Sequence, residues 1–483
     1  MNLKLNGKQM QFRSQRASSN PVRVFFLLTL VLGGLFLLRS IGSGAVKPLY
    51  DITPTPTRYA TNYALEGQTH FQAGNLPKAI DAYQLALQQD PENVQLWVEL
   101  ARIQAYSASA LSTDQQKYDR LQDALASATR ATEINPDMSL AHATRAFILD
   151  WVASNPLSEG ETARLLTEAE QTAERALTLD SKNALAMAYN AEILVDNQRW
   201  SQAEGYINQA MQLNKEEMDI WRVYAYVQES LGNYNESINA YKRAAEITPN
   251  LTFLYNYIAR TYRHLRQYDE ALRYYAIAVA INQNLGITDP NPYIGIAKTY
   301  IQTGDFFAAS LNVRKALQFD VANPDVYAQL GIVYWHARNY EGSIPAFRCA
   351  LYGCDAETAC EVRKCDKTVD PMVSIQGMPL TGSTVVYYYT YGSVLAAMHG
   401  VGDDLCNQAV QVLGQVEDRY RSDVNIMSIV GTSQEICATY GIYRDGSGPI
   451  IPFEPTPEAT EESTPEPVDG MSATPAVTGT PQP

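Results

Sequence analysis

The sequence predicts an all-α protein built from a stack of helical hairpins, with a membrane-spanning helix near its N-terminus and a disordered C-terminal tail. Three observations lead to this prediction: an apolar run at residues 24–38, a pattern of residue types that recurs from about residue 59 to residue 354, and a final segment rich in Pro, Thr and Glu. With 483 residues, 46% of them hydrophobic, the chain can bury a substantial core.

The apolar run "VFFLLTLVLGGLFLL" covers residues 24–38. Its fifteen residues would span about 22 Å as a helix, which is short of the roughly 30 Å hydrocarbon layer, so a spanning helix has to extend toward Val46. We therefore expect a transmembrane signal anchor over residues 21–46. A basic cytoplasmic N-terminus over residues 1–20 would precede it, and a Pro/Thr linker over residues 47–58 would follow it.

Two other interpretations of the apolar run stay open. The small residues Ser43, Gly44 and Ala45 suit cleavage as a signal peptide, and a run of this length also occurs in buried helices of soluble domains. Residues 1–23 hold five Lys or Arg and no acid, which favours an N-terminus that stays in the cytoplasm. The rest of the chain is then expected on the extracytoplasmic side of the cytoplasmic membrane, whether or not the segment is cleaved.

The chain is acidic, with a formal net charge of −15, and its charges are unevenly distributed. Residues 1–50 hold seven Lys or Arg and no acid, whereas residues 454–483 hold six Asp or Glu and no base. The middle of the chain stays acidic when both ends are set aside. Because such a protein repels phosphates, we expect no nucleic-acid partner.

The stretch "LGNYNESINAYKRAAEITPN" at residues 231–250 contains the recurring pattern: a turn glycine, a small residue, an aromatic, a second small residue and a proline. Offsets of four and three place Ser237, Tyr241 and Ala244 on one helix face, where small residues admit a neighbouring helix and the aromatic fills the groove. The same order appears in "GNLPKAIDAYQLALQQDP", "RQYDEALRYYAIAVAINQ", "GDFFAASLNVRKALQFDV" and "RNYEGSIPAFRCALYGCD". Closing positions lie thirty-four residues apart, at Ser181, Lys215, Pro249 and Gln283.

This period, with these residue types, resembles the tetratricopeptide repeat (TPR) family. The resemblance covers eight repeats over residues 59–353, and it implies a right-handed superhelix of about eight or nine helical hairpins. Wider gaps between repeats are explained by insertions near residues 107–118 and 153–161. The second and third repeats depart from the pattern, because they have Ala128 and Ala173 where an aromatic is usual.

The pattern breaks after the eighth repeat. We expect a cysteine-containing loop insert over residues 354–384, a degenerate ninth hairpin with a capping helix over residues 385–443, and a disordered tail over residues 444–483. A capping helix is needed because the last repeat would otherwise expose its apolar face to water. The tail is too rich in Pro, Thr and Glu to bury a core, and anchoring in a cell wall stays open as its role.

All six cysteines lie in the C-terminal part of the chain, which indicates a disulfide framework in an exported protein. They are Cys349, Cys354, Cys360, Cys365, Cys406 and Cys437. The sequence does not choose among fifteen pairings, although we expect Cys406 with Cys437 and the other four among themselves. A zinc site and a redox thiol pair stay open, and with them a thiol- or metal-dependent activity, but the spacing lacks the close pairs that these sites usually have.

No other residues form a convincing catalytic or metal-binding pattern, so we expect a scaffold without enzymatic activity, metal or cofactor. In TPR superhelices the first helix of each hairpin lines a concave surface that commonly binds extended peptides. Between the fifth and seventh repeats, residues with groove-facing spacing make a basic, aromatic strip that suits an acidic or carboxylate-bearing segment, unless they are ordinary surface charges. These residues are Arg222, Tyr226, Asn256, Arg260, Arg263 and Lys298. The sequence therefore predicts a membrane-tethered scaffold that binds a protein or extended peptide through this groove.

Overall fold

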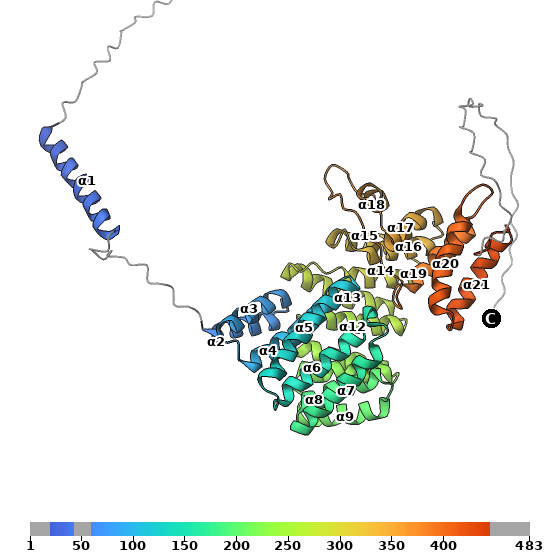
Figure 1. Ribbon diagram of the computed structural model, residues 1–483, viewed down its shortest axis with the longest axis horizontal. Coiled ribbons are helices and arrows are strands. Elements are labelled where there is room, and N and C mark those ends of the chain that lie inside the picture. Colours follow the sequence, from blue (N-terminus) through green and yellow to red (C-terminus); the bar gives the residue numbers. More distant parts are fainter. Residues whose placement is uncertain (1–19, 43–58, 445–483) are drawn as a thin grey trace, which may run out of the picture. The chain divides into compact units, whose positions relative to one another are not determined.

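The computed structural model describes residues 20–42 and 59–444 (Figure 1). These residues form 21 α-helices and one short 3-10 helix, and the described part of the chain has no β-strand beyond one isolated bridge. The chain divides into two compact units, residues 1–62 and residues 63–483. The predicted basic N-terminus (residues 1–20), linker (residues 47–58) and tail (residues 444–483) lie outside the described residues, apart from residues 20 and 444.

The first unit contains helix α1 (Pro21–Gly42). Residues 21–40 have a mean hydropathy of 2.2, and none of this segment is buried inside the protein. By length and composition the segment can cross a membrane, and a signal sequence near the N-terminus would meet the same criteria. Arg39 lies in the last turn of α1, so the helix extends past the apolar run as a spanning segment requires.

Eight consecutive helical hairpins run from Ala60 to Tyr352 (Figure 1). They are α2 (Ala60–Gln72) with α3 (Leu76–Gln89), α4 (Val94–Ala108) with α5 (Asp114–Ile134), α6 (Ser139–Ala153) with α7 (Thr162–Leu179), α8 (Ala184–Asp196) with α9 (Trp200–Leu213), α10 (Met218–Ser230) with α11 (Tyr234–Ile247), α12 (Thr252–His264) with α13 (Tyr268–Leu285), α14 (Asn291–Thr303) with α15 (Phe306–Phe319), and α16 (Pro324–His336) with α17 (Tyr340–Tyr352). Each second helix also packs on the first helix of the next hairpin, so the hairpins form a continuous stack.

The small and aromatic positions of the repeat fit together in these hairpins. Ser237, Tyr241 and Ala244 of α11 are all buried, as their spacing predicts. In the first hairpin a Cβ atom on Gly67 of α2 would lie only 2.6 Å from the ring of Tyr83 on α3. Glycine is therefore required there, because any side chain would displace the aromatic ring that fills the groove between the helices.

The two longer insertions lie inside the second and third hairpins. In the second, α4 ends at Ala108 and α5 begins at Asp114, and α5 extends over 21 residues. In the third, a 3-10 helix (Pro156–Ser158) lies between α6 and α7. The insertions thus lengthen the connections of two hairpins and leave the stacking of their helices intact.

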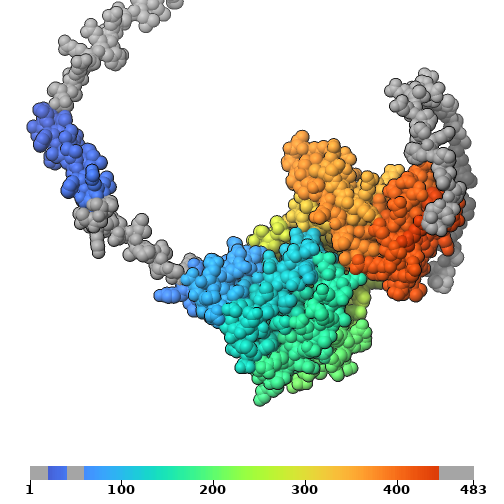
Figure 2. Space-filling model, in the orientation of Figure 1, coloured from blue at the N-terminus to red at the C-terminus, as the bar shows by residue number. Residues whose placement is uncertain are grey.

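The insertions contact the C-terminal part of the same unit. The hydroxyl of Ser112 donates a hydrogen bond of 2.7 Å to Asp320, and Arg419 forms an ion pair of 3.0 Å with Glu159. The space-filling view shows the blue-to-green and the orange-to-red parts of this unit in contact (Figure 2). The stack therefore coils back on itself, so that hairpins far apart in the sequence become neighbours.

The region after the repeats differs in one respect from the predicted loop insert. Residues 354–384 contain a short helix, α18 (Ala356–Arg363), which Asp355 caps by accepting a 2.8 Å hydrogen bond from the backbone of Thr358. An eight-residue helix has too few turns to show a clear hydrophobic period, so the sequence pattern alone does not reveal it.

The last three helices complete the unit. Helices α19 (Val385–Met398) and α20 (Leu405–Tyr420) form a hairpin, and α21 (Val424–Ala438) packs on both of them. The disulfide Cys406–Cys437 joins α20 to α21, which is the pairing that the sequence analysis expects. It closes a loop across 31 positions and stabilises the fold by about 3–4 kcal/mol in the chain-entropy model.

The core of the second unit consists of two main apolar clusters. The first extends from Phe71 on α2 to Tyr275 on α13, and the second from Tyr293 on α14 to Cys437 on α21. Their boundary coincides with the segment between α13 and α14, residues 286–290, which contains "TDP" at residues 288–290. The first cluster includes the helices that build the site described below.

Candidate binding pocket on the inner face of the repeats

Aromatic rings fill the centre of the inner face of the second to sixth hairpins. The ring centroids of Phe147 and Tyr189 lie 4.6 Å apart in a stacked pair, and those of Tyr106 and Phe253 lie 5.2 Å apart in another. Tyr106, Phe147 and Tyr189 are fully buried. Since these residues come from α4, α6, α8 and α12, four first helices meet at one centre.

A buried carboxylate, Asp219 at the start of α10, holds this centre together. It accepts hydrogen bonds from Arg102 at 2.8 Å, from the hydroxyl of Tyr189 at 2.7 Å and from the hydroxyl of Tyr106. Burial opposes the charge of Asp219, but Arg102, Arg222 and the two hydroxyls hold its pKa below the usual value. The carboxylate is therefore charged and fully paired, and it ties α4 to α10.

Arg222 of α10 is the second buried charge of this centre. Its guanidinium donates two hydrogen bonds of 2.7 Å to the carboxylate of Glu192, a bidentate pair, and its side chain is 3% exposed. The guanidinium also lies 5.3 Å from the ring centroid of Phe147 and 5.5 Å from that of Trp151. Glu192 further accepts a 3.0 Å hydrogen bond from the indole of Trp151, so the pair is neutral and well enclosed.

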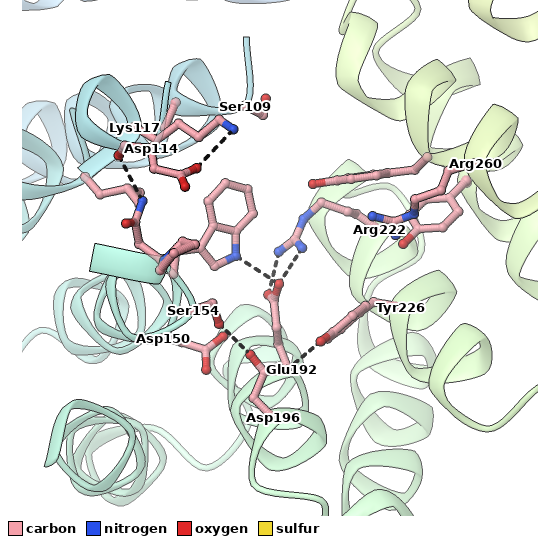
Figure 3. Close-up of a pocket in the computed structure, with 17 residues that line it drawn as sticks. Ser109, Asp114, Lys117, Asp150, Ser154, Glu192, Asp196, Arg222, Tyr226 and Arg260 are labelled. Carbon is pink, nitrogen blue, oxygen red and sulfur yellow. Dashed lines mark hydrogen bonds and ion pairs between the residues drawn. The ribbon is translucent and has the colours of Figure 1, made fainter. Parts of the chain in front are cut away.

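Beside this centre the inner face remains open as a pocket of about 490 Å³ (Figure 3). It lies at α4, α6, α8, α10 and α12, and the insertions of the second and third hairpins form part of its wall. The lining residues are Ala108, Ser109, Asp114, Lys117, Leu121, Asp150, Trp151, Ser154, Asn155, Pro156, Glu192, Asp196, Arg222, Tyr226, Tyr241, Tyr257 and Arg260. Polar and aromatic side chains therefore dominate the wall.

Two carboxyl groups in this pocket form no ion pair with a cation of the described residues. Asp196 accepts hydrogen bonds from the hydroxyls of Tyr226 at 2.5 Å and Ser154 at 3.0 Å. Asp150 is 1% exposed, and neither of its carboxyl oxygens has a hydrogen-bond partner in the part of the chain that the structure describes. Burial raises the pKa of Asp150 well above the usual value, and the nearby Asp196 and Glu192 add to this effect.

Three protein-family models, each described as tetratricopeptide repeat, match residues 61–103, 190–251 and 254–289. The chain contains tetratricopeptide repeats. The second and third of these matches cover most of the TPR helices from α8 to α13, and so include much of the pocket wall. No curated protein matches the sequence.

Solved TPR structures are also similar to this chain. A tetratricopeptide repeat protein from Parabacteroides merdae is 18% identical, with 57% of this chain and 98% of that chain covered and a TM-score of 0.32. A thermophilic TPR protein from Thermus thermophilus is 17% identical, with 42% and 98% covered and a TM-score of 0.34. YrrB, a TPR protein with an unusual peptide-binding site, is 18% identical, with 44% and 97% covered and a TM-score of 0.30.

The six residues of the predicted TPR groove divide into two groups. Arg222, Tyr226 and Arg260 line the pocket, and each is already bonded to an acid of this chain. Arg260 is exposed and reaches Glu229 at 3.2 Å, while its guanidinium lies 5.0 Å from the ring centroid of Tyr257. The basic side chains that were expected to receive a partner are thus largely neutralised from within.

The other three predicted residues lie outside the pocket lining. The side chains of Arg263 and Lys298 are half-buried and form no ion pair or hydrogen bond with the described residues. The side-chain oxygen of Asn256 is buried and also has no partner among them. Burial lowers the pKa of Lys298, and Arg263 and Lys117 lower it further, whereas Asp325 opposes them. Positive charge therefore gathers on this part of α12 and α14 without full compensation.

Sequence reasoning missed the acids of the pocket, although a signal for them exists. Glu192 and Arg222 are 30 positions apart, and so are Asp196 and Tyr226, while Glu229 and Arg260 are 31 apart. This separation is slightly less than one repeat, and the residues of each pair lie on consecutive first helices. An acid followed by a polar partner at this spacing thus identifies side chains that meet on the inner face.

The cysteines are all joined in disulfides in the structure. Besides Cys406–Cys437, the bonds are Cys349–Cys354 and Cys360–Cys365, each across 5 positions. These two short bridges lie at the end of α17 and at α18. Because every cysteine sulfur is used in a disulfide, the alternative of a thiol activity or a cysteine-bound metal gains no support.

Proposed function

We propose that this chain is a membrane-tethered TPR scaffold that binds a protein or an extended peptide segment on the extracytoplasmic side of the membrane. The observation that carries the proposal is the pocket of about 490 Å³ on the inner face of the repeats. Its volume falls within the roughly 300–1,000 Å³ that is typical of binding pockets. TPR repeats indicate a protein-interaction role, and the pocket supplies a place for contact.

Two features support the membrane and compartment parts of the proposal. Helix α1 is long and apolar enough to span a bilayer, and the basic residues that precede it favour a cytoplasmic N-terminus. Three disulfides suit an oxidising compartment, since cytosolic thiols are kept reduced. A membrane-impermeant biotin ester added to intact spheroplasts should label lysines of the repeats. If the lysines are labelled only after the spheroplasts have been lysed, this orientation is refuted.

Two cations on α12 and α14 whose side chains form no ion pair among the described residues support an acidic partner segment. Arg263 and Lys298 lie on successive first helices, where an extended peptide would run across the repeats. A carboxylate placed between them would relieve the repulsion of the two cations and gain charge-assisted hydrogen bonds. This part of the inner face would therefore contact the acidic portion of the partner, next to the pocket.

Crosslinking in intact cells, followed by identification of the captured protein, tests the binding role. The variant Arg260→Glu/Arg263→Glu reverses two charges on α12 and should lose most of the crosslinked partner. A matched control, Arg243→Glu/Arg273→Glu, reverses two exposed charges on the second helices α11 and α13 and should keep it. Equal capture by both variants would refute binding through the inner face.

A further inference from the structure

We propose that the pocket receives a lysine or arginine side chain of the bound partner and that Asp150 and Asp196 are the acceptors of its cationic group. This inference rests on the proposed function and names the chemistry of the segment that enters the pocket. It follows from the charges of the lining residues, from the wall of the pocket and from the charges at the two ends of the chain itself.

The acids of the pocket region are not equally satisfied. Glu192 is neutralised by the bidentate contact with Arg222, and Glu229 nearby is paired with Arg260. By contrast, within the described residues Asp196 is bonded only to hydroxyl groups, and both carboxyl oxygens of Asp150 are buried without a partner. A buried polar group without a partner costs free energy, so a donor that reaches Asp150 would recover that cost.

The two acceptors lie close together at the wall of the pocket (Figure 3). Ser154, one helical turn after Asp150 on α6, donates its hydrogen bond to Asp196 on α8. An ammonium group carries three donors and a guanidinium five, so either can bridge two carboxyl groups. A single cation would satisfy Asp150 and at the same time balance the charge of Asp196.

The rest of the wall suits the stem of a long cationic side chain. Four aromatic residues line the pocket, namely Trp151, Tyr226, Tyr241 and Tyr257. Such rings cover the methylene groups of lysine or arginine and attract the cation when it lies over a ring. The guanidinium of Arg222 does not oppose entry, because its charge is cancelled by Glu192.

Neither end of this chain fits the pocket as well as a separate partner. Residues 454–483 hold six acids and no base, so they bring no cation to the pocket, and their negative charge would not be favoured beside its unpaired acids. Residues 1–23 are basic, but the proposed topology leaves them on the other side of the membrane. The occupant is therefore a basic side chain of another protein.

Matched peptides test this inference on the full-length protein in a mild detergent. The probe is a Gly-Gly-Lys-Gly-Gly pentapeptide with fluorescein at the N-terminus and an amide at the C-terminus, and its binding is followed by fluorescence anisotropy. Replacing the lysine by norleucine keeps the stem and removes the charge, and replacing it by glutamate reverses the charge. We expect the norleucine peptide to bind roughly tenfold more weakly, and the glutamate peptide to bind more weakly still. Equal binding of all three peptides would overturn the inference.

Two isosteric variants test the acceptors. Asp150→Asn and Asp196→Asn should each weaken binding of the lysine peptide by roughly tenfold and leave the norleucine peptide unaffected. The control Asp137→Asn removes an exposed acid outside the pocket and should bind like the wild type. The thermal unfolding midpoint of Asp150→Asn should not fall, because the change removes a buried carboxyl group. If this variant proves unstable, the binding measured with Asp196→Asn tests the inference on its own. Unchanged lysine binding in both variants would refute the assignment.

A free amine is a second source of the same chemistry. Spermidine at the same concentration should displace the labelled peptide poorly, because it lacks the backbone that the inner face contacts. Displacement as strong as that by unlabelled lysine peptide would assign the pocket to free polyamines and overturn the partner part of the inference. If the crosslinked partner persists in cells while the lysine preference is missing, this inference fails and the proposed function stands. If the wild-type protein captures no specific partner in the cell crosslinking, the proposed function is refuted instead.

Discussion

Replacing Asp289 with asparagine should stabilise the folded protein at neutral pH. Asp289 lies just before α14 and is 2% exposed. It accepts hydrogen bonds from the backbone of Asn291 at 2.9 Å and from the amide of Asn282 at 3.1 Å, while the carbonyl oxygen of Asn282 is buried without a partner among the described residues. With asparagine at 289, the amide of Asn282 can turn over, so that its carbonyl oxygen accepts from the new side chain.

The magnitude follows from the pKa of this carboxyl group. Burial raises the pKa of Asp289 from 3.8 to about 6, although the hydrogen bonds from Asn291 and Asn282 oppose the rise. Below pH 3.8 both folded and unfolded chains are protonated, and no penalty exists. Between pH 3.8 and about 6 the unfolded state loses its proton first, so the free energy of unfolding decreases as pH rises. Above that range the full cost, about 3 kcal/mol, destabilises the wild type.

Urea unfolding of the full-length protein in mild detergent, at pH 4 and at pH 8, measures the effect. Asp289→Asn should unfold at higher urea than the wild type at pH 8, by up to about 3 kcal/mol, and at nearly the same urea at pH 4. Asp137→Asn, at an exposed site, should show no such dependence. A gain of equal size at both pH values, or a loss at pH 8, would show that the carboxylate is not destabilising there.

Two further changes test the packing of the coil. Gly74 has φ +79°, and an added Cβ would lie 2.2 Å from the backbone oxygen of Asn250. Gly232 has a similar φ of +82° but open space around it, so Gly232→Ala should lower the free energy of unfolding by roughly 1 kcal/mol. Gly74→Ala should lower it by clearly more, because the added methyl group also meets the backbone of Asn250. Equal urea midpoints for the two alanine variants would contradict the contact. Arg222→Met leaves Glu192 buried without a counter-ion and should cost about 3–5 kcal/mol, of which Glu192→Gln in the same chain should restore a large part. No recovery in the double variant would show that Glu192 is not the residue left uncompensated.

The sequence was sufficient for the hairpins because their determinants are local. Ser237, Tyr241 and Ala244 are spaced by the geometry of a single helix, and the thirty-four-residue period places equivalent faces in register. The spacing along the first helices also predicts Arg222 and Tyr226 as inner-face residues, and both line the pocket. Local spacing could not show that these two side chains are already bonded within the chain, because their partners, Glu192 and Asp196, come from the preceding repeat.

The pocket itself depends on how tightly the stack coils, which no local pattern specifies. Asp150 and Asp196 lie on α6 and α8, which pack directly on each other, whereas the pocket beside them also needs α4, α10 and α12, which are drawn in by contacts such as that of Arg102 with Asp219. A retrospective signal exists in the stretch "FILDWVA" at residues 147–153, where an acid interrupts an apolar run. Such an acid is unusual in a helix core and is a reason to look for a partner or a function.

The contact between distant hairpins also bears on how this protein folds. In a straight stack each repeat meets only its neighbours, so terminal repeats can fray and folding can begin anywhere. Here Arg102 and Asp219 are 117 positions apart, and Arg419 and Glu159 are 260 apart. Such long-range contacts form only after long segments of the chain are ordered, so we expect slow folding. They also join repeats that are far apart in the sequence into one cooperative unit. Removal of a single terminal hairpin should therefore weaken repeats at the opposite end of the coil.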